Sequence, residues 1–265
     1  MKTRQEFFAH YLRHCTVAHA LWRSYECERF AQERFQGPIL DLGCGDGFFA
    51  SAVFGHLDAG IDLDGTEIER AEKKGIYDVV ICASATRMPF KSGAFRTVVS
   101  NCVLEHIPDI DAVLKECFRV LKPGGIVVTT VPSEIWDSGS YYLKFFRWFG
   151  FNEAGQWYNR KLNQVFRHYH VDEKKVWATR FRKAGFKLVK AEYLIPEQVH
   201  HTFERWFIPA IPAKIWKSLF KRWILIPASR FWAPGFFNWW FRDMLKLEGE
   251  KGVCYYLVAR KQRAR

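Results

Sequence analysis

The sequence predicts an α/β protein with a parallel, doubly wound sheet, and three observations indicate this class. Short apolar runs typical of strands alternate with longer stretches of helical periodicity. A glycine-rich turn at residues 43–47 follows the first apolar run and opens a helical stretch. A chain of 265 residues is also long enough to bury one large core. Such alternation is typical of βαβ units, in which a helix connects two parallel strands.

The elements follow in a regular order. Residues 5–35 carry apolar side chains at three- and four-residue steps, which predicts a helix that Gly37-Pro38 ends. Strands are then expected over residues 39–42, 59–63, 79–82, 97–100 and 126–131. Helices are expected to begin at about residue 48 and to cover residues 66–74 and 109–121.

The pattern changes after Pro132. Residues 133–170 are rich in aromatic and basic side chains and contain no clear strand. A helix over 172–184 ends at Gly185, and strands are expected over 186–195 and 252–260. The residues between these two strands include six of the eleven tryptophans of the chain, which indicates an insertion.

The charge of the chain is unevenly distributed. The formal net charge is +12, yet residues 37–131 hold nine basic and 13 acidic side chains. Residues 200–246 hold eight basic side chains and two acidic ones. The flanks and the insertion are therefore where an anionic partner is expected to bind.

The cysteines and the first residues indicate a compartment. Seven cysteines are scattered without a Cys-x-x-Cys pair, which argues against a disulfide framework or a zinc knuckle, and no metal is expected. The first residues contain no apolar run typical of a signal peptide. We therefore expect a protein of the reducing cytoplasm.

The strongest functional signal is the glycine-rich turn after Ile39–Leu42. Glycines allow a tight turn and let a ligand approach the backbone, and ligands of doubly wound sheets bind at the carboxyl ends of the strands. Asp62 ends the next expected strand, where its carboxylate can accept hydrogen bonds from a ribose diol. Asp64 is better placed to interact with the N-terminus of the following helix.

These residues resemble motifs of the class I S-adenosylmethionine-dependent methyltransferases, particularly the ubiquinone/menaquinone-biosynthesis-like (type 11) group. The resemblance covers about residues 37–132 and implies a Rossmann-like, seven-stranded sheet whose final strand is antiparallel. Five motifs occur in the family's order and spacing: Ile39–Gly47, Gly60-Ile61-Asp62, Arg87-Met88-Pro89-Phe90, Asn101-Cys102-Val103-Leu104-Glu105-His106 and Arg119-Val120-Leu121-Lys122-Pro123-Gly124-Gly125.

The resemblance implies S-adenosylmethionine as the cofactor. Asp41 and the glycine turn would hold its methionine moiety, Asp62 its ribose, and Asn101 would line the sulfonium region. Ser84 stands where the family often has an Asp that accepts from the adenine amino group, so a hydroxyl or a backbone carbonyl would act there. The competing cofactor is a nicotinamide dinucleotide, whose usual fingerprint is Gly-x-Gly-x-x-Gly. The expected cofactor-binding residues are Asp41, Gly43, Cys44, Gly45, Gly47, Asp62, Leu63, Ser84, Ala85, Asn101 and Cys102.

Methyl transfer from a sulfonium is an in-line displacement that mainly requires alignment and exclusion of water, so no single catalytic residue is obligatory. His106 follows the fourth expected strand and is a candidate base; the alternative is a histidine that orients the loop. His168 and His170 precede the helix at 172 and are candidates for substrate contact. The residues expected to line the acceptor are Asp137, Tyr141 and Tyr142.

The insertion contains an amphipathic stretch at 214–224. Trp216, Phe220 and Trp223 fall on its apolar side, and Lys217 and Lys221 on the opposite side. This pattern is typical of a helix that lies in a membrane interface, and the prolines around it argue against a spanning helix. The alternatives are a lid or dimer element, and an RNA-binding surface.

The sequence therefore predicts a peripheral membrane methyltransferase on the cytoplasmic face that modifies oxygen or carbon of a lipidic or lipid-linked acceptor. The alternatives are a soluble small-molecule methyltransferase with a lid, and an RNA-binding methyltransferase-like protein; nucleic acid is the least expected partner. The oligomeric state is left open. The expected divisions are an N-terminal helical segment (1–36), a Rossmann-like domain (37–199 and 247–265) and an aromatic, basic insertion (200–246).

Overall fold

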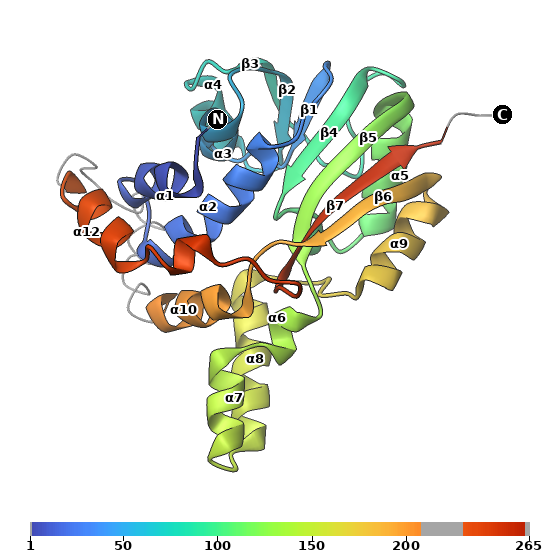
Figure 1. Cartoon of the computed structure of the whole chain (residues 1–265). Coiled ribbons are helices and arrows are strands. Elements are labelled where there is room, and N and C mark those ends of the chain that lie inside the picture. Colours follow the sequence, from blue (N-terminus) through green and yellow to red (C-terminus); the bar gives the residue numbers. More distant parts are fainter. Residues whose placement is uncertain (1, 208–229, 263–265) are drawn as a thin grey trace. The chain divides into compact units, whose positions relative to one another are not determined.

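The computed structural model of the chain describes residues 2–207 and 230–262 (Figure 1). The chain forms two compact units, each made of segments that are distant in the sequence. The sheet unit consists of residues 33–134, 163–192 and 254–265, and the helical unit consists of residues 1–32, 135–162 and 193–253.

The sheet unit is built around seven strands in the order β3-β2-β1-β4-β5-β7-β6 (Figure 1). The pairs β1–β2, β2–β3, β1–β4 and β4–β5 are parallel, and β7 pairs antiparallel with β5. The predicted α/β class, with seven strands and an antiparallel final strand, is confirmed. The strands are β1 (Ile39–Leu42), β2 (Leu57–Asp62), β3 (Tyr77–Cys82), β4 (Phe95–Asn101), β5 (Leu121–Pro132), β6 (Phe186–Tyr193) and β7 (Cys254–Lys261).

Helices connect these strands, and two of them are amphipathic and have an aspartate as N-cap. Asp64 accepts a hydrogen bond from the Thr66 amide at the start of α4, which confirms the helix-terminal role expected of Asp64. Asp109 caps α5 in the same way, and α5 buries one apolar stripe against the sheet while it also packs on α9. The helices of the sheet unit are α3 (Phe48–Val53), α4 (Gly65–Glu72), the short 3₁₀ helix η1 (Leu104–His106), α5 (Ile110–Val120) and α9 (Lys174–Lys183).

The first helical stretch differs from the expectation. One helix was expected over 5–35, but the chain forms α1 (Arg4–Leu12) and α2 (Val17–Ala31). The single-helix prediction is therefore wrong. Thr16 adopts an extended backbone, and its side chain accepts from the His19 amide, so α2 has its own N-cap. A capping residue inside an apolar periodic pattern ends one helix and starts the next.

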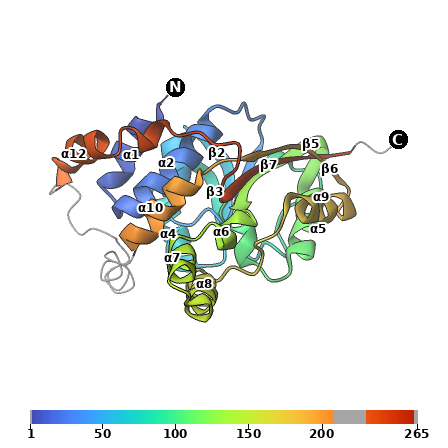
Figure 2. The same ribbon diagram turned by 60° about the horizontal axis from the view of Figure 1, so that its bottom comes forward.

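The helical unit has an aromatic core. Helix α2 lies between α1 and α10, and α12 packs on α1 (Figure 2). Trp22 contacts Trp136 and Phe203, and Phe8 meets Phe241 edge to face with ring centroids 5.9 Å apart. Both ends of the expected insertion thus contribute to this core. The other helices of the unit are α6 (Ile135–Ser138), α7 (Tyr141–Trp148), α8 (Asn152–Phe166, which ends in the sheet unit), α10 (Glu197–Phe207), α12 (Ala233–Trp240) and the 3₁₀ helix η3 (Met244–Lys246).

None of the helices described is both long and apolar enough to cross a bilayer. The five residues expected to contact a membrane lie outside the described part of the chain. They are Trp216, Lys217, Phe220, Lys221 and Trp223.

Candidate functional site

The glycine turn has the backbone that its sequence requires. Gly43, Gly45 and Gly47 have φ angles of +75°, +53° and +70°, in the left-handed region that disfavours other residues. A Cβ at Gly43 would lie 2.5 Å from the side chain of Val103, so Gly43 also permits close packing. A Cβ at Gly45 would meet nothing within 4 Å. The turn therefore leaves room for a ligand directly above Gly45.

Asp62, at the end of β2, holds this turn in place. One carboxylate oxygen accepts from the Gly45 amide at 2.9 Å, and the other accepts from the Asp64 amide at 3.0 Å. Each carboxylate oxygen can accept a second hydrogen bond. Asp62 can therefore shape the turn and still accept hydrogen bonds from a ribose diol. Leu63, the next residue, is largely exposed.

Asp41 on β1 is buried and accepts a hydrogen bond from the Tyr77 hydroxyl at 2.7 Å. Tyr77 begins β3, so its ring must cross β2 to reach Asp41. Gly60 lets it pass, since a Cβ at Gly60 would lie 3.1 Å from the ring. Burial raises the pKa of Asp41 to about 7; Asp62 also raises it, while the Tyr77 hydrogen bond opposes the rise. Asp41 therefore changes its charge near neutral pH.

The segment expected to flank adenine is anchored to α5. Arg119 donates to the carbonyls of Met88 and Phe90, and Glu116 accepts from the Met88 amide at 2.7 Å. Hydrogen bonds thus join the motif at residues 87–90 to the motif at residues 119–125. The hydroxyl of Ser84 lies 2.8 Å from that of Thr86, and Ser84 also accepts from the Thr86 amide. Ala85, between them, is half-buried.

Asn101 and Cys102 lie at the carboxyl end of β4. The Thr130 hydroxyl donates a hydrogen bond to the side-chain oxygen of Asn101 at 2.7 Å and accepts one from the Cys102 amide. Cys102 has a φ angle of +52°, which is uncommon for a residue with a side chain. Cys44, in the glycine turn, is buried. The expected methionine, ribose and sulfonium residues thus lie at or just after the carboxyl ends of β1, β2 and β4, respectively, and these strands are neighbours in the sheet (Figure 1).

The structure brings two of the three candidate histidines together. The rings of His106 and His168 stack with centroids 5.3 Å apart, beside the buried Glu105. Burial, and then the nearby His106, lower the pKa of His168 to about 3, so His168 is neutral at physiological pH. His170 lies further along, where one ring nitrogen is 3.0 Å from the Ile107 carbonyl and the other 3.1 Å from Arg180.

The expected acceptor-lining residues belong to the helical unit. Asp137 lies on α6, where its carbonyl accepts from Asn159. Tyr141 and Tyr142 begin α7; Tyr142 packs on Tyr158 of α8 with ring centroids 5.0 Å apart. Their role at the acceptor stays a prediction.

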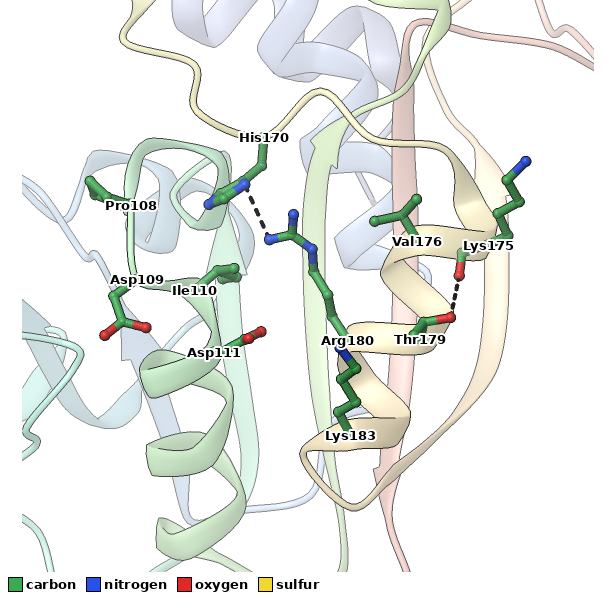
Figure 3. A pocket seen from close by; sticks show the side chains of 10 residues that line it. All are labelled: Pro108, Asp109, Ile110, Asp111, His170, Lys175, Val176, Thr179, Arg180 and Lys183. Atoms are coloured by element: carbon green, nitrogen blue, oxygen red, sulfur yellow. Dashed lines mark hydrogen bonds between the residues drawn. The ribbon is translucent and has the colours of Figure 1, made fainter.

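A pocket of about 670 Å³ lies between the start of α5 and helix α9 (Figure 3). Asp109 and Asp111 line one side, while Lys175, Arg180 and Lys183 come from α9. Some of its polar groups have partners within the chain: Asp109 caps α5, and Arg180 contacts His170 and pairs with Asp172 at 2.9 Å. None of the expected cofactor residues lines it. The glycine turn and its neighbouring strand ends, which we call the cradle, therefore stay the predicted cofactor site.

Some residues that build the site were not predicted from the sequence. Tyr77 and Glu105 reach it through contacts that local patterns do not show, although Glu105 lies within a motif that was recognised. For Tyr77, the one available signal was Gly60, because a glycine inside an apolar strand marks a close approach. Val103, which packs on Gly43, likewise carried no signal of its own.

The fold and the cradle define a nucleotide-binding domain of the Rossmann-like class. Residues 40–129 match the protein family described as a methyltransferase domain. The predicted resemblance is thereby confirmed, and S-adenosylmethionine is the cofactor that this class of domain implies.

Two curated relatives illustrate the similarity. An uncharacterized methyltransferase of Mycobacteroides abscessus is 30% identical over 130 residues, which is 46% of this chain and 50% of that protein. The mitochondrial 2-methoxy-6-polyprenyl-1,4-benzoquinol methylase of Leishmania donovani is 28% identical over 210 residues, which is 66% of this chain and 70% of that protein. The chain spans about half the length of the first of these and of similar mycobacterial relatives.

Solved structures share this fold. A methyltransferase from Thermotoga maritima, described as a possible histamine N-methyltransferase, superposes with a TM-score of 0.57 at 17% identity. The superposition covers 93% of this chain and 92% of that one. At this identity the likeness supports the fold alone.

Proposed function

We propose that this protein transfers a methyl group from S-adenosylmethionine to oxygen or carbon of a lipidic or lipid-linked acceptor at a membrane surface. The observation that carries the methyl-transfer part is the cradle itself. Three left-handed glycines, a carboxylate at the end of β2 and an open space above Gly45 lie inside the matched domain segment.

The residues present fit this cofactor. The Asp41 carboxylate can pair with the amino group of its methionine moiety, and Asp62 can accept from its ribose. The bound sulfonium supplies an activated methyl group. The chain then has to align the acceptor with the methyl–sulfur bond and exclude water, which pre-organised strand ends do well.

Exposed aromatic side chains support the lipidic part of the proposal. Soluble surfaces rarely expose many large apolar side chains together, and Trp favours the membrane interface. Eleven Phe and Trp side chains are exposed in the described residues, and all of them belong to the helical unit. They are Phe145, Trp148, Phe149, Phe151, Trp157, Trp206, Phe231, Trp232, Phe236, Trp239 and Trp240.

Two further observations point the same way. The amphipathic, basic pattern of residues 214–224 suits an anionic bilayer surface. The polyprenyl benzoquinol named for the Leishmania relative is a lipidic acceptor. A membrane-bound substrate would require the enzyme to work at that surface.

The test is transfer of label from [methyl-³H]S-adenosylmethionine into a lipid extract, measured after solvent partition. We expect label in the organic phase with the unmodified protein and none with Asp62→Ala. Asp78→Ala, which removes an exposed carboxylate of the neighbouring strand β3, should transfer label normally. Label only in water-soluble compounds would overturn the lipidic acceptor, and label only in RNA would overturn the substrate class.

A further inference from the structure

The segment after β4 carries a cluster that the cradle does not use. Glu105, His106 and His168 each offer one ligand atom, and these atoms lie within 4.8 Å of one another. Among the described residues this is the one group of three or more His, Cys, Asp or Glu side chains that could hold a metal ion. Two imidazoles and a carboxylate suit a divalent transition metal such as Zn²⁺ and leave coordination positions open.

Hydrogen bonds hold the two segments of this cluster together. The Tyr169 amide donates to the Glu105 carbonyl at 2.8 Å, and a ring nitrogen of His170 lies 3.0 Å from the Ile107 carbonyl. These hydrogen bonds are made by the two residues that follow His168, and they hold His168 next to Glu105 and His106. A metal site needs such pre-organisation, because its ligands must keep their geometry when the ion is absent.

The histidine rings are oriented as metal ligands usually are. Nδ1 of His106 lies 3.3 Å from the Arg167 carbonyl, and Nδ1 of His168 lies 3.2 Å from the side-chain oxygen of Asn163. An oxygen at Nδ1 favours the tautomer that carries its proton there, which makes Nε2 the ligand atom. Nε2 of His106 lies 3.8 Å from a Glu105 carboxylate oxygen, a separation that one small ion can bridge with a slight contraction.

The backbone next to the cluster is unusual. Cys102 and Arg167 are the two non-glycine residues with positive φ in the described part of the chain, at +52° and +55°. Each lies within three residues of a proposed ligand. Uncommon backbone conformations persist where the surrounding structure demands them, and they concentrate at functional sites.

The cluster also adjoins the cofactor cradle. Val103 packs directly on Gly43 of the glycine turn, and Glu105 follows two residues later. An ion held there would lie on the side of the cradle where the methyl group is expected.

We propose that Glu105, His106 and His168 bind a divalent transition-metal ion that coordinates the hydroxyl oxygen of the methyl acceptor. This inference rests on the proposed function and makes the acceptor an oxygen nucleophile. The metal lowers the pKa of the bound hydroxyl, whose proton leaves to solvent. The oxygen then forms a bond to the methyl carbon, the carbon–sulfur bond breaks, and its electron pair returns to sulfur. The proposal departs from the expectation of no metal, which rested on the pattern of the cysteines.

The test is titration of the metal-free protein with Co²⁺, followed by visible absorption, and with Zn²⁺, followed by calorimetry. We expect one ion per chain. His168→Ala and Glu105→Gln should each weaken Zn²⁺ binding by more than about tenfold, since second-shell changes alone cost that much. His56→Asn, which removes an exposed histidine that pairs with Asp78, should bind normally. Circular dichroism of each variant checks that it folds, and Glu105→Gln retains the shape of the buried side chain.

The outcomes separate this inference from the proposed function. Absence of Zn²⁺ binding, or binding unchanged in both Glu105→Gln and His168→Ala, would overturn the metal site even if S-adenosylhomocysteine binds. Zn²⁺ binding without S-adenosylhomocysteine binding would support the metal site and overturn the proposed function. Label transfer to carbon, shown by a product that keeps its free hydroxyl, would overturn the role given to the metal.

Discussion

Single residues of the cradle serve two purposes at once. Asp62 accepts hydrogen bonds from two backbone amides and retains acceptor positions for a ribose. Asp41 is buried, where water cannot stabilise its charge, and Tyr77 offsets part of that cost with a hydrogen bond from its side chain. The cofactor's cationic amino group would supply the missing opposite charge. Ligand binding and ionisation of Asp41 should therefore be coupled.

This coupling predicts a pH dependence of cofactor binding. The pKa of Asp41 is raised to about 7, so the carboxyl is protonated below that pH and ionised above it. Affinity for S-adenosylhomocysteine should rise between pH 6 and 8, approaching tenfold per pH unit on the acid side. Tyr77→Phe removes a hydrogen bond that lowers the pKa, so the rise should move to higher pH. Calorimetry at several pH values measures the rise in affinity and its displacement in Tyr77→Phe. Asp41→Asn should abolish the pH dependence. An affinity of the unmodified protein that does not change with pH would contradict the coupling.

At the scale of elements, α7 of the helical unit is held by a buried acid. Glu204 of α10 accepts hydrogen bonds from the Ser140 hydroxyl at 2.9 Å and from the Tyr141 amide, at the N-terminus of α7. The positive end of a helix and these donors favour the carboxylate, but burial has the larger effect and raises the pKa of Glu204 to about 7. The junction between α7 and α10 is thus most stable when Glu204 is protonated.

The sign of the resulting stability change follows from proton linkage. Between the ordinary pKa of 4.5 and the raised value of about 7, the folded state binds more protons than the unfolded state. The contribution of Glu204 to the free energy of unfolding should therefore fall as pH rises through this range, by at most roughly 3 kcal/mol. Glu204→Gln should remove that slope, as measured by urea unfolding at several pH values. Glu197→Gln, on the half-exposed side of α10, is the matched control; equal slopes in all three proteins would refute the assignment.

At the scale of the whole molecule, the two units present different surfaces. The exposed large apolar residues of the sheet unit are Leu63, Val79, Val165, Tyr169 and Val189, with no Phe or Trp among them. The helical unit exposes Phe and Trp, including Trp239 at 62% and Trp240 at 58%. A membrane contact should therefore depend on the helical unit.

Liposome co-sedimentation tests this expectation. Replacing Trp239 and Trp240 by Ser should reduce binding to vesicles that contain anionic lipid by about tenfold or more, because each buried indole contributes more than 1 kcal/mol. Val79→Ser with Val189→Ser makes a matched control on the sheet unit and should bind like the unmodified protein. S-adenosylhomocysteine affinity should stay the same in every variant. Equal sedimentation of the Trp variant would place the lipid contact elsewhere.

Both ends of the insertion belong to the folded core of the helical unit. A deletion of residues 200–246 would remove Phe203, Glu204 and Phe241, which are buried in the helical unit. It would also remove the Met244 and Leu245 carbonyls that accept hydrogen bonds from Tyr25 and Arg4. This deletion would therefore destabilise the helical unit. Point substitutions are needed to separate membrane contact from stability.

The sequence by itself determined the sheet, the glycine turn and the two aspartates at strand ends, Asp41 and Asp62, because these depend on local signals. Strand periodicity, a glycine-rich turn and a carboxylate at a strand end are read within a few residues. The break between α1 and α2 was missed although Thr16 is a local signal, since the apolar periodicity continued across it.

Only the tertiary structure decided which distant residues meet. Tyr77 reaches Asp41 across a neighbouring strand. His168 stacks on His106, although the two histidines are far apart in the sequence. Such pairs are set by strand order and by backbone hydrogen bonds between loops, which leave no periodic trace in the chain. The candidate cofactor cradle could therefore be predicted from motifs, whereas the buried charges and the cluster of Glu105, His106 and His168 depend on packing between segments that are far apart in the sequence.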